Sequence, residues 1–254
     1  MGRKYFAWSF DDGLEQDRKI VSILKEYGLG ATFHLNSSMF GDKTYEGRIG
    51  NLGMTEKPAD SFDPARRHLL PYVEHFRLSK EEAMQLYEGF EVASHTCHHV
   101  NLMKCSEEER EKEITEDVKD LSEIFGYQVT GFAFPYGVGA KQSREALQKA
   151  GIQYARTIQT AKDFLFPEDP LAMPMTCWHV SKKAIEKLDS FLLAKPQEED
   201  LFFLMFAHGY EFDFNTKESN WDKFRRICER VSLHKDVTAC SIGEAFRMHE
   251  EGVR

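Results

Sequence analysis

Short apolar runs alternate along the chain with longer stretches in which apolar residues recur at helical spacing. The apolar runs predict β-strands, the last of them weaker than the rest, at residues 5–10, 30–35, 90–94, 131–134, 154–158, 201–207 and 237–240. The stretches between them predict helices. This alternation is typical of an α/β protein with a parallel sheet.

Helix start and stop signals support the same pattern. Apolar residues within 20–27 repeat at helical spacing, and Gly28 follows as a stop. Ser-x-x-Glu sequences begin at Ser79 and at Ser106, and each is typical of a capping box that opens a helix. We predict that the second of these helices ends near Gly126.

The segment 37–77 interrupts the alternation. It contains glycine at positions 41, 47, 50 and 53 and proline at 58, 64 and 71, with little periodicity. These residues favour turns, so the segment predicts a long loop or insertion rather than a linker between domains. We expect a single domain over residues 1–254, in which this insertion shapes the substrate cleft.

Composition and charge exclude several classes of partner. A chain of 254 residues with 41% hydrophobic residues can bury one large core. The formal net charge of −9 argues against nucleic acid or an anionic membrane as the main partner, because phosphate binding needs clustered Lys and Arg.

The chain also lacks the sequence features of membrane and secreted proteins. No run approaches the roughly 18 apolar residues of a membrane span, and the start reaches the acidic Asp11 before any apolar segment typical of a signal peptide. We therefore expect a cytoplasmic protein, and a native leader outside this sequence is the alternative. The five cysteines are scattered without a C-x-x-C pair, so neither a disulfide framework nor a cysteine-rich zinc site is expected.

Candidate chemistry begins where the first predicted strand ends. The sequence Ser-Phe-Asp-Asp-Gly at residues 9–13 places two adjacent carboxylates, Asp11 and Asp12, at that point. Neighbouring strand residues point to opposite sides, so the two carboxylates can do different jobs. Taken alone, Asp-Asp-Gly is more often a simple turn.

A histidine cluster follows the predicted strand at 90–94. His95 and His99 are four residues apart, so on one helical turn they share a face and can bind one cation. His98 and Cys97 are then expected to point elsewhere. Such a pair also arises by accident on surfaces, but ligands for a catalytic metal come from different strand ends of one face, and Asp12 with these histidines satisfies that condition.

Two later strand ends carry polar candidates. Pro135, Tyr136 and Gly137 form a turn that can present a backbone N–H and an aromatic wall to a ligand, although such a sequence is more often only a turn. His208 follows the predicted strand at 201–207, where it is either a satisfied structural group or a proton donor. His34 falls at a strand position that predicts a core or cleft histidine rather than a ligand.

These four pieces, in this order, resemble the polysaccharide deacetylase (NodB-homology, carbohydrate esterase) family. Its motifs run Thr/Ser-Phe-Asp-Asp-Gly, His-Ser/Thr-x-x-His, Arg-x-Pro-Tyr and a late Leu-x-His. The first two match in full, as residues 9–13 and 95–99, and the resemblance extends to about residue 213. Either motif alone is weak, but their conjunction is specific.

The resemblance implies an α/β fold, a distorted (β/α) barrel of about seven parallel strands similar to a TIM barrel. It implies removal of an N- or O-acetyl group from a sugar with one divalent metal ion. The residues at the matching positions are the base Asp11, the metal ligands Asp12, His95 and His99, the Tyr136 backbone N–H for the oxyanion, and the acid His208. Zinc is the first choice of metal, and Co²⁺, Ni²⁺ or Fe²⁺ also suit such ligands.

Two departures from the family pattern stand out. The arginine of the third motif is replaced by Ala133. We hypothesise that Arg156 on the next strand supplies the missing charge to the base, and a surface or structural arginine is the alternative. The Asp-x-x-Asp-Trp motif of the family is absent from its expected region. Glu211 or Asp213 is the candidate carboxylate to orient the acid, and an exposed acidic loop is the alternative for both.

Three functions remain open at this point. The first is deacetylation, most simply N-deacetylation, of an acetylated carbohydrate, with Pro135, Tyr136 and Trp178 as candidate substrate-binding residues. The second is hydrolysis of another amide, such as a ureide or cyclic imide, because a fold and a metal do not fix the acyl group. The third is a weakly active glycan-binding relative, which only Ala133 favours.

Overall fold

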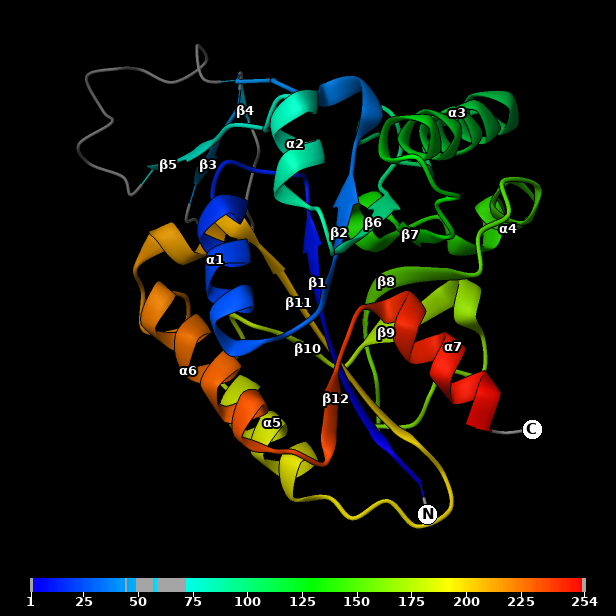
Figure 1. Ribbon diagram of the computed structural model, residues 1–254. Helices are drawn as coiled ribbons and strands as arrows, with labels where there is room; N and C mark the ends of the chain where they lie inside the picture. Colours follow the sequence, from blue (N-terminus) through cyan, green and yellow to red (C-terminus); the bar gives the residue numbers. More distant parts are fainter. Residues whose placement is uncertain (1, 44, 49–56, 59–71, 253–254) are drawn as a thin grey trace.

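The computed structural model describes residues 2–43, 45–48, 57–58 and 72–252. Its main sheet is made of parallel strands (Figure 1). In spatial order these are β10 (Cys177–Trp178), β11 (Leu201–His208), β1 (Lys4–Asp11), β2 (Ala31–Leu35), β6 (Glu91–Ser94), β7 (Gly131–Ala133), β8 (Tyr154–Thr160) and β9 (Met173–Met175). A further strand, β12 (Val237–Ala239), also pairs with β1.

The sheet curls until its two edges nearly meet. Only Thr176 separates β9, which pairs with β8, from β10, which pairs with β11. The Thr176 N–H donates to the carbonyl of Leu204 on β11 at 2.9 Å, so the same passage of chain contacts both edges. Because β9 and β10 together form one passage of chain along the barrel wall, the wall consists of seven such passages. The predicted distorted (β/α) barrel is confirmed.

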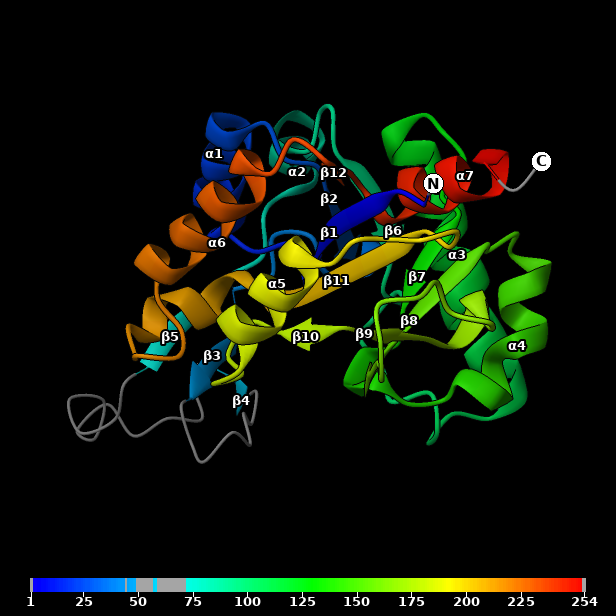
Figure 2. The same cartoon turned by 90° about the horizontal axis from the view of Figure 1, so that it is seen from below.

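Helices surround this barrel (Figures 1 and 2). They are α1 (Asp17–Tyr27), α2 (Lys80–Leu86), α3 (Glu107–Phe125), α4 (Ala140–Lys149), α5 (Ala184–Leu193), α6 (Trp221–Leu233) and α7 (Ile242–Gly252). Both predicted capping boxes are present, at the starts of α2 and α3. Helix α1 ends at Gly28, whose φ of 66° is the left-handed conformation that favours glycine.

The alternation of side chains along β1 separates the hydrophobic core from the site. Phe6, Trp8 and Phe10 are buried in the main hydrophobic cluster, which includes apolar residues of α1 and α6. Burying each of these rings stabilises the fold by about 1.5–3 kcal/mol. Ser9 and Asp11 therefore point to the opposite side, where polar groups meet them.

The segment predicted to be a long loop contains a small second sheet. Strands β3 (Tyr45–Arg48), β4 (Lys57–Pro58) and β5 (Tyr72–His75) pair antiparallel in the order β4-β3-β5. The prediction of a long loop or insertion named no strands here, because the apolar residues of these short strands are interrupted by polar residues, glycine or proline. The other parts of the prediction between residues 44 and 71 lie outside the described residues.

Two general features complete the fold. All five cysteines are free thiols. Within the part of the chain that the structure describes, no helix combines the length and the apolar character needed to cross a bilayer.

Candidate active site

Polar side chains gather at the carboxyl ends of three strands, β11, β1 and β6, with β2 between the last two. Asp11 is the last residue of β1 and Asp12 follows it, His95 follows β6, and His208 is the last residue of β11. Because these strands are parallel, their carboxyl ends open on the same face of the barrel. The order β11-β1-β2-β6 therefore brings together residues that are far apart in sequence.

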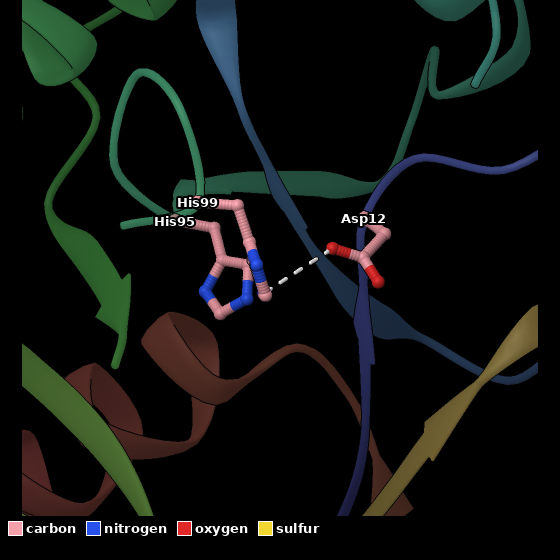
Figure 3. Close-up of side chains that lie close together, drawn as sticks. All are labelled: Asp12, His95 and His99. Atoms are coloured by element: carbon pink, nitrogen blue, oxygen red, sulfur yellow. Dashed lines mark ion pairs between the residues drawn. The ribbon is translucent and has the colours of Figure 1, made fainter. Parts of the chain in front are cut away.

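Asp12, His95 and His99 converge on one point (Figure 3). One ligand atom from each lies within 4.8 Å of the others. The two imidazole centroids are 4.9 Å apart, and His99 Nε2 lies 3.7 Å from Asp12 Oδ1. Two imidazoles and one carboxylate are donors that zinc and related divalent ions accept, so this donor set fits a metal ion with open positions.

The histidine motif is not the helical turn that its spacing predicted. Residues 95–99 form an irregular loop in which Thr96 and His99 have φ of 66° and 52°. Asn36 Nδ2 donates to the carbonyls of His95 and Thr96, and the buried Asp117 of α3 accepts from the backbone N–H of His95 at 3.1 Å. Tertiary hydrogen bonds therefore replace the helix in bringing the two imidazoles together.

The neighbours of the two histidines point away, as predicted. His98 is exposed and lies 2.8 Å from Glu113, while Cys97 is buried next to Ser37. Within the pair itself, His95 Nδ1 lies 2.8 Å from the carbonyl oxygen of Ala133. A carbonyl can only accept, so Nδ1 carries the proton, and Nε2 presents its lone pair to a cation.

Asp11 forms a buried ion pair with Arg156. Arg156 Nη2 donates to Asp11 Oδ1 at 2.6 Å, and its Nε donates to Ser9 Oγ at 2.9 Å. Burial alone would raise the pKa of Asp11, but Arg156, His95 and His34 outweigh it and hold the pKa well below its usual range. The structure thus places the Arg156 guanidinium beside Asp11, the carboxylate for which this chain has no arginine at position 133.

His208 lies near Asp12 and contacts Glu211. His208 Nδ1 is 3.2 Å from Glu211 Oε1, and Glu211 Oε2 accepts the backbone N–H of His208 at 2.9 Å. Burial would lower the pKa of His208, but Glu211 and then Asp12 and Asp11 raise it to about 9. The indole N–H of Trp178 also donates to Glu211, at 3.1 Å.

The structure decides between the two candidate partners of His208. Glu211 is buried and contacts the imidazole, whereas Asp213 accepts from the indole of Trp221 at 2.7 Å. Trp178 donates a hydrogen bond to Glu211. Its role in substrate binding stays a prediction.

The Pro-Tyr-Gly turn follows β7 as a short 3₁₀ segment, Pro135–Gly137. Tyr136 has a φ of 58°, a left-handed conformation that non-glycine residues rarely adopt. Its ring lies 4.9 Å from that of His99, and the residue is 53% exposed. Strained backbone of this kind gathers at functional sites.

Two buried residues at the site were not anticipated from the sequence. His75 Nε2 lies 3.2 Å from Asp12 Oδ2, and Arg77 Nη2 donates to Asp12 Oδ1 at 3.2 Å. Burial would raise the pKa of Asp12, but His99, Arg77 and His75 hold it well below its usual range. Both residues lie at the end of the insertion, where the sequence shows no periodic pattern. The available signal was the alternation of polar and apolar residues from His75 to Leu78.

The fold and site together define a class of protein, a nearly closed (β/α) barrel with carboxylates and imidazoles at the carboxyl ends of its strands. Residues 1–155 match the family model described as polysaccharide deacetylase. The chain belongs to the polysaccharide deacetylase family. None of the curated proteins matches it.

Solved structures share the fold at low sequence identity. A candidate polysaccharide deacetylase from Mycobacterium smegmatis is 16% identical, with a TM-score of 0.62 over 99% of this chain and 92% of that one. The peptidoglycan deacetylase PdaC from Bacillus subtilis is 16% identical, with a TM-score of 0.51 over 98% and 93%. A family 4 carbohydrate esterase from Streptomyces lividans, in complex with acetate, is 13% identical, with a TM-score of 0.51 over 92% and 91%.

Proposed function

We propose that this chain is a metal-dependent hydrolase that removes an acetyl group, most simply an N-acetyl group, from a sugar or oligosaccharide. The observation that carries the proposal is the convergence of Asp12, His95 and His99 within 4.8 Å. A separate carboxylate, Asp11, and a separate imidazole, His208, lie beside them. Family membership supports acetyl as the acyl group that is transferred to water.

The metal ligands in this proposal are Asp12, His95 and His99, with Zn²⁺ as the first choice and Co²⁺, Ni²⁺ or Fe²⁺ as alternatives. A bound divalent ion supplies Lewis-acid chemistry, which polarises an acyl oxygen and lowers the pKa of water. The chain's part is to orient the ligands. The carbonyl of Ala133 does so for His95 by fixing its tautomer.

Asp11 is the proposed base, oriented by Arg156. With its pKa held low it stays ionised, so it is always available as a proton acceptor. Such a carboxylate is also a weak base, so its main part is to align an attacking water and take a proton that the water gives up easily. Arg156 holds the Asp11 carboxylate in one geometry, and the hydroxyl of Ser9, which accepts from Arg156, holds the guanidinium in turn.

His208 is the proposed acid. Glu211 keeps its pKa at about 9, so the imidazole is protonated at neutral pH and can give its proton to the departing amine. The backbone N–H of Tyr136 is the proposed donor to the oxyanion, and Pro135, Tyr136 and Trp178 are the proposed walls of the sugar site. The S. lividans esterase was solved with acetate, which agrees with an acetyl-accepting site of this fold.

The test measures metal content and acetate release together. Purified wild type, Asp12→Ala, His95→Ala and the control His98→Ala are compared on a panel of N- and O-acetylated sugars. We expect one metal ion per chain and acetate release in the wild type and in His98→Ala, whose side chain faces Glu113. Both properties should be lost in the other two variants.

Other results would separate the alternatives. Metal without acetate release, together with turnover of a ureide or cyclic imide, would assign a different acyl group to the same site. Ligand affinity without any turnover would indicate a glycan-binding relative. If the wild type binds no metal under any loading, the proposal is wrong.

A further inference from the structure

The chain that follows β5 lies against the turn that carries Asp12. Residues 76–78 run antiparallel to residues 13–15, with backbone hydrogen bonds of 2.8 and 2.9 Å on either side of a bridge at Arg77. This pairing fixes the position of the insertion's last residues relative to Asp12. His75 and Arg77 therefore reach Asp12 from ordered backbone.

Each oxygen of Asp12 contacts one of these side chains. His75 Nε2 is 3.2 Å from Oδ2, and Arg77 Nη2 is 3.2 Å from Oδ1. Both side chains are buried, and the imidazole packs edge-on against Tyr210 with centroids 4.7 Å apart. Asp12 itself has a φ of 79°, a strained conformation that persists only where its surroundings hold it.

The two contacts have different consequences for a cation at the site. Oδ1 is the oxygen that faces His99, at 3.7 Å, so Arg77 and a divalent ion use the same oxygen. A guanidinium stays charged at any working pH, and in a buried site its repulsion of a second cation is weakly screened. His75 instead contacts Oδ2, which leaves Oδ1 turned toward His99, and partners that orient a ligand carboxylate favour metal binding.

We propose that His75 and Arg77 are positioning residues that set the affinity of the site for a divalent cation with opposite sign. His75 strengthens binding by orienting Asp12, and Arg77 weakens it by competing for Oδ1. The inference rests on the proposed function for the existence of the metal site, and it is independent of which acyl group is removed.

The test is the Zn²⁺ affinity of the full chain, measured by competition with a chromogenic chelator. Arg77→Met should bind Zn²⁺ about tenfold or more tightly than wild type, because the competing charge is gone. His75→Phe keeps the ring against Tyr210 but loses Nε2, and it should bind about 10- to 100-fold more weakly. Arg77→Lys keeps the charge and should stay within about threefold of wild type.

Arg18→Met is the matched control, because Arg18 is exposed and pairs with Glu15 and Glu82 beside the same turn. Its affinity should equal that of wild type. If Arg77→Met binds Zn²⁺ no more tightly than wild type, or if His75→Phe binds it equally well, the inference is overturned.

A second measurement covers the case in which Arg77→Met or His75→Phe prevents folding. In wild type labelled with ¹⁵N-arginine, the guanidinium signal that is missing from Arg77→Lys should shift on addition of Zn²⁺. A signal that does not move overturns the competition. Wild type that binds no Zn²⁺ would instead refute the metal site itself, and zinc binding without acetate release would refute only the proposed reaction.

Discussion

The buried pair of Asp11 and Arg156 gives the most direct quantitative prediction. Arg156 is fully buried, donates to both Asp11 and Ser9, and lies over the ring of Phe206 at 4.3 Å. Arg156→Met keeps an apolar stem against that ring but leaves the carboxylate buried without its cation. Breaking a buried pair in this way costs about 3–5 kcal/mol of unfolding free energy.

Unfolding in urea and thermal scans measure this cost. For a chain of this size, 3–5 kcal/mol corresponds to a fall in Tm of about 6–20 °C. The double variant Asp11→Asn, Arg156→Met removes both charges and should recover at least about 2 kcal/mol relative to the sum of the single variants. Acetate turnover in Arg156→Met should fall about 100-fold or more, because the base loses its orientation.

Arg144→Met is the control, since Arg144 forms a half-exposed pair with Asp169. Such surface pairs contribute about 0–1 kcal/mol, so this variant should lose little stability and no activity. If Arg156→Met is no less stable than Arg144→Met, or if the effects of Asp11→Asn and Arg156→Met simply add, the reasoning from the buried pair is refuted.

Three further predictions concern other groups of the site and its surroundings. Glu211→Gln should lower kcat for acetate release about 100-fold, because His208 loses the anion that keeps it protonated, while metal content stays unchanged; unaltered turnover would contradict this. Tyr136→Gly keeps the backbone N–H and removes only the ring, so KM should rise with kcat within about fivefold, and a large loss of kcat would argue against the backbone role. Burial, only partly offset by hydrogen bonds from Tyr87 and Leu14, raises the pKa of Asp17 to about 7. A carboxyl with a raised folded-state pKa stabilises most at low pH, and wild type loses up to about 4 kcal/mol as pH rises from about 4 to 7. Asp17→Asn should escape this loss, so its stability relative to wild type in urea should increase between pH 5 and 8; a constant difference would contradict the assignment.

The local elements of the barrel could be predicted because their signals are local. Apolar runs gave the seven predicted strands to within two residues at each end, and the capping boxes at Ser79 and Ser106 marked the starts of α2 and α3. The motif residues Asp11 and Asp12 lie where the first apolar run ends, as the sequence indicated. The short strands β9 and β10 and the sheet of the insertion were missed, because their apolar residues are interrupted by proline, glycine or polar residues and form no continuous run.

The amino-acid sequence by itself therefore determined the α/β class, the family and the order of the site residues along the chain, since each follows from a pattern within a few neighbouring residues. Only the tertiary structure decided which groups meet. Three strands, β2, β6 and β7, separate β8, which carries Arg156, from β1 in the sheet order. Arg156 reaches Asp11 because the sheet curls into a barrel. His95 and His99 converge on a loop held by Asn36 and Asp117 rather than on a helix. Contacts of this kind depend on sheet curvature and on hydrogen bonds between distant segments, which no local spacing encodes.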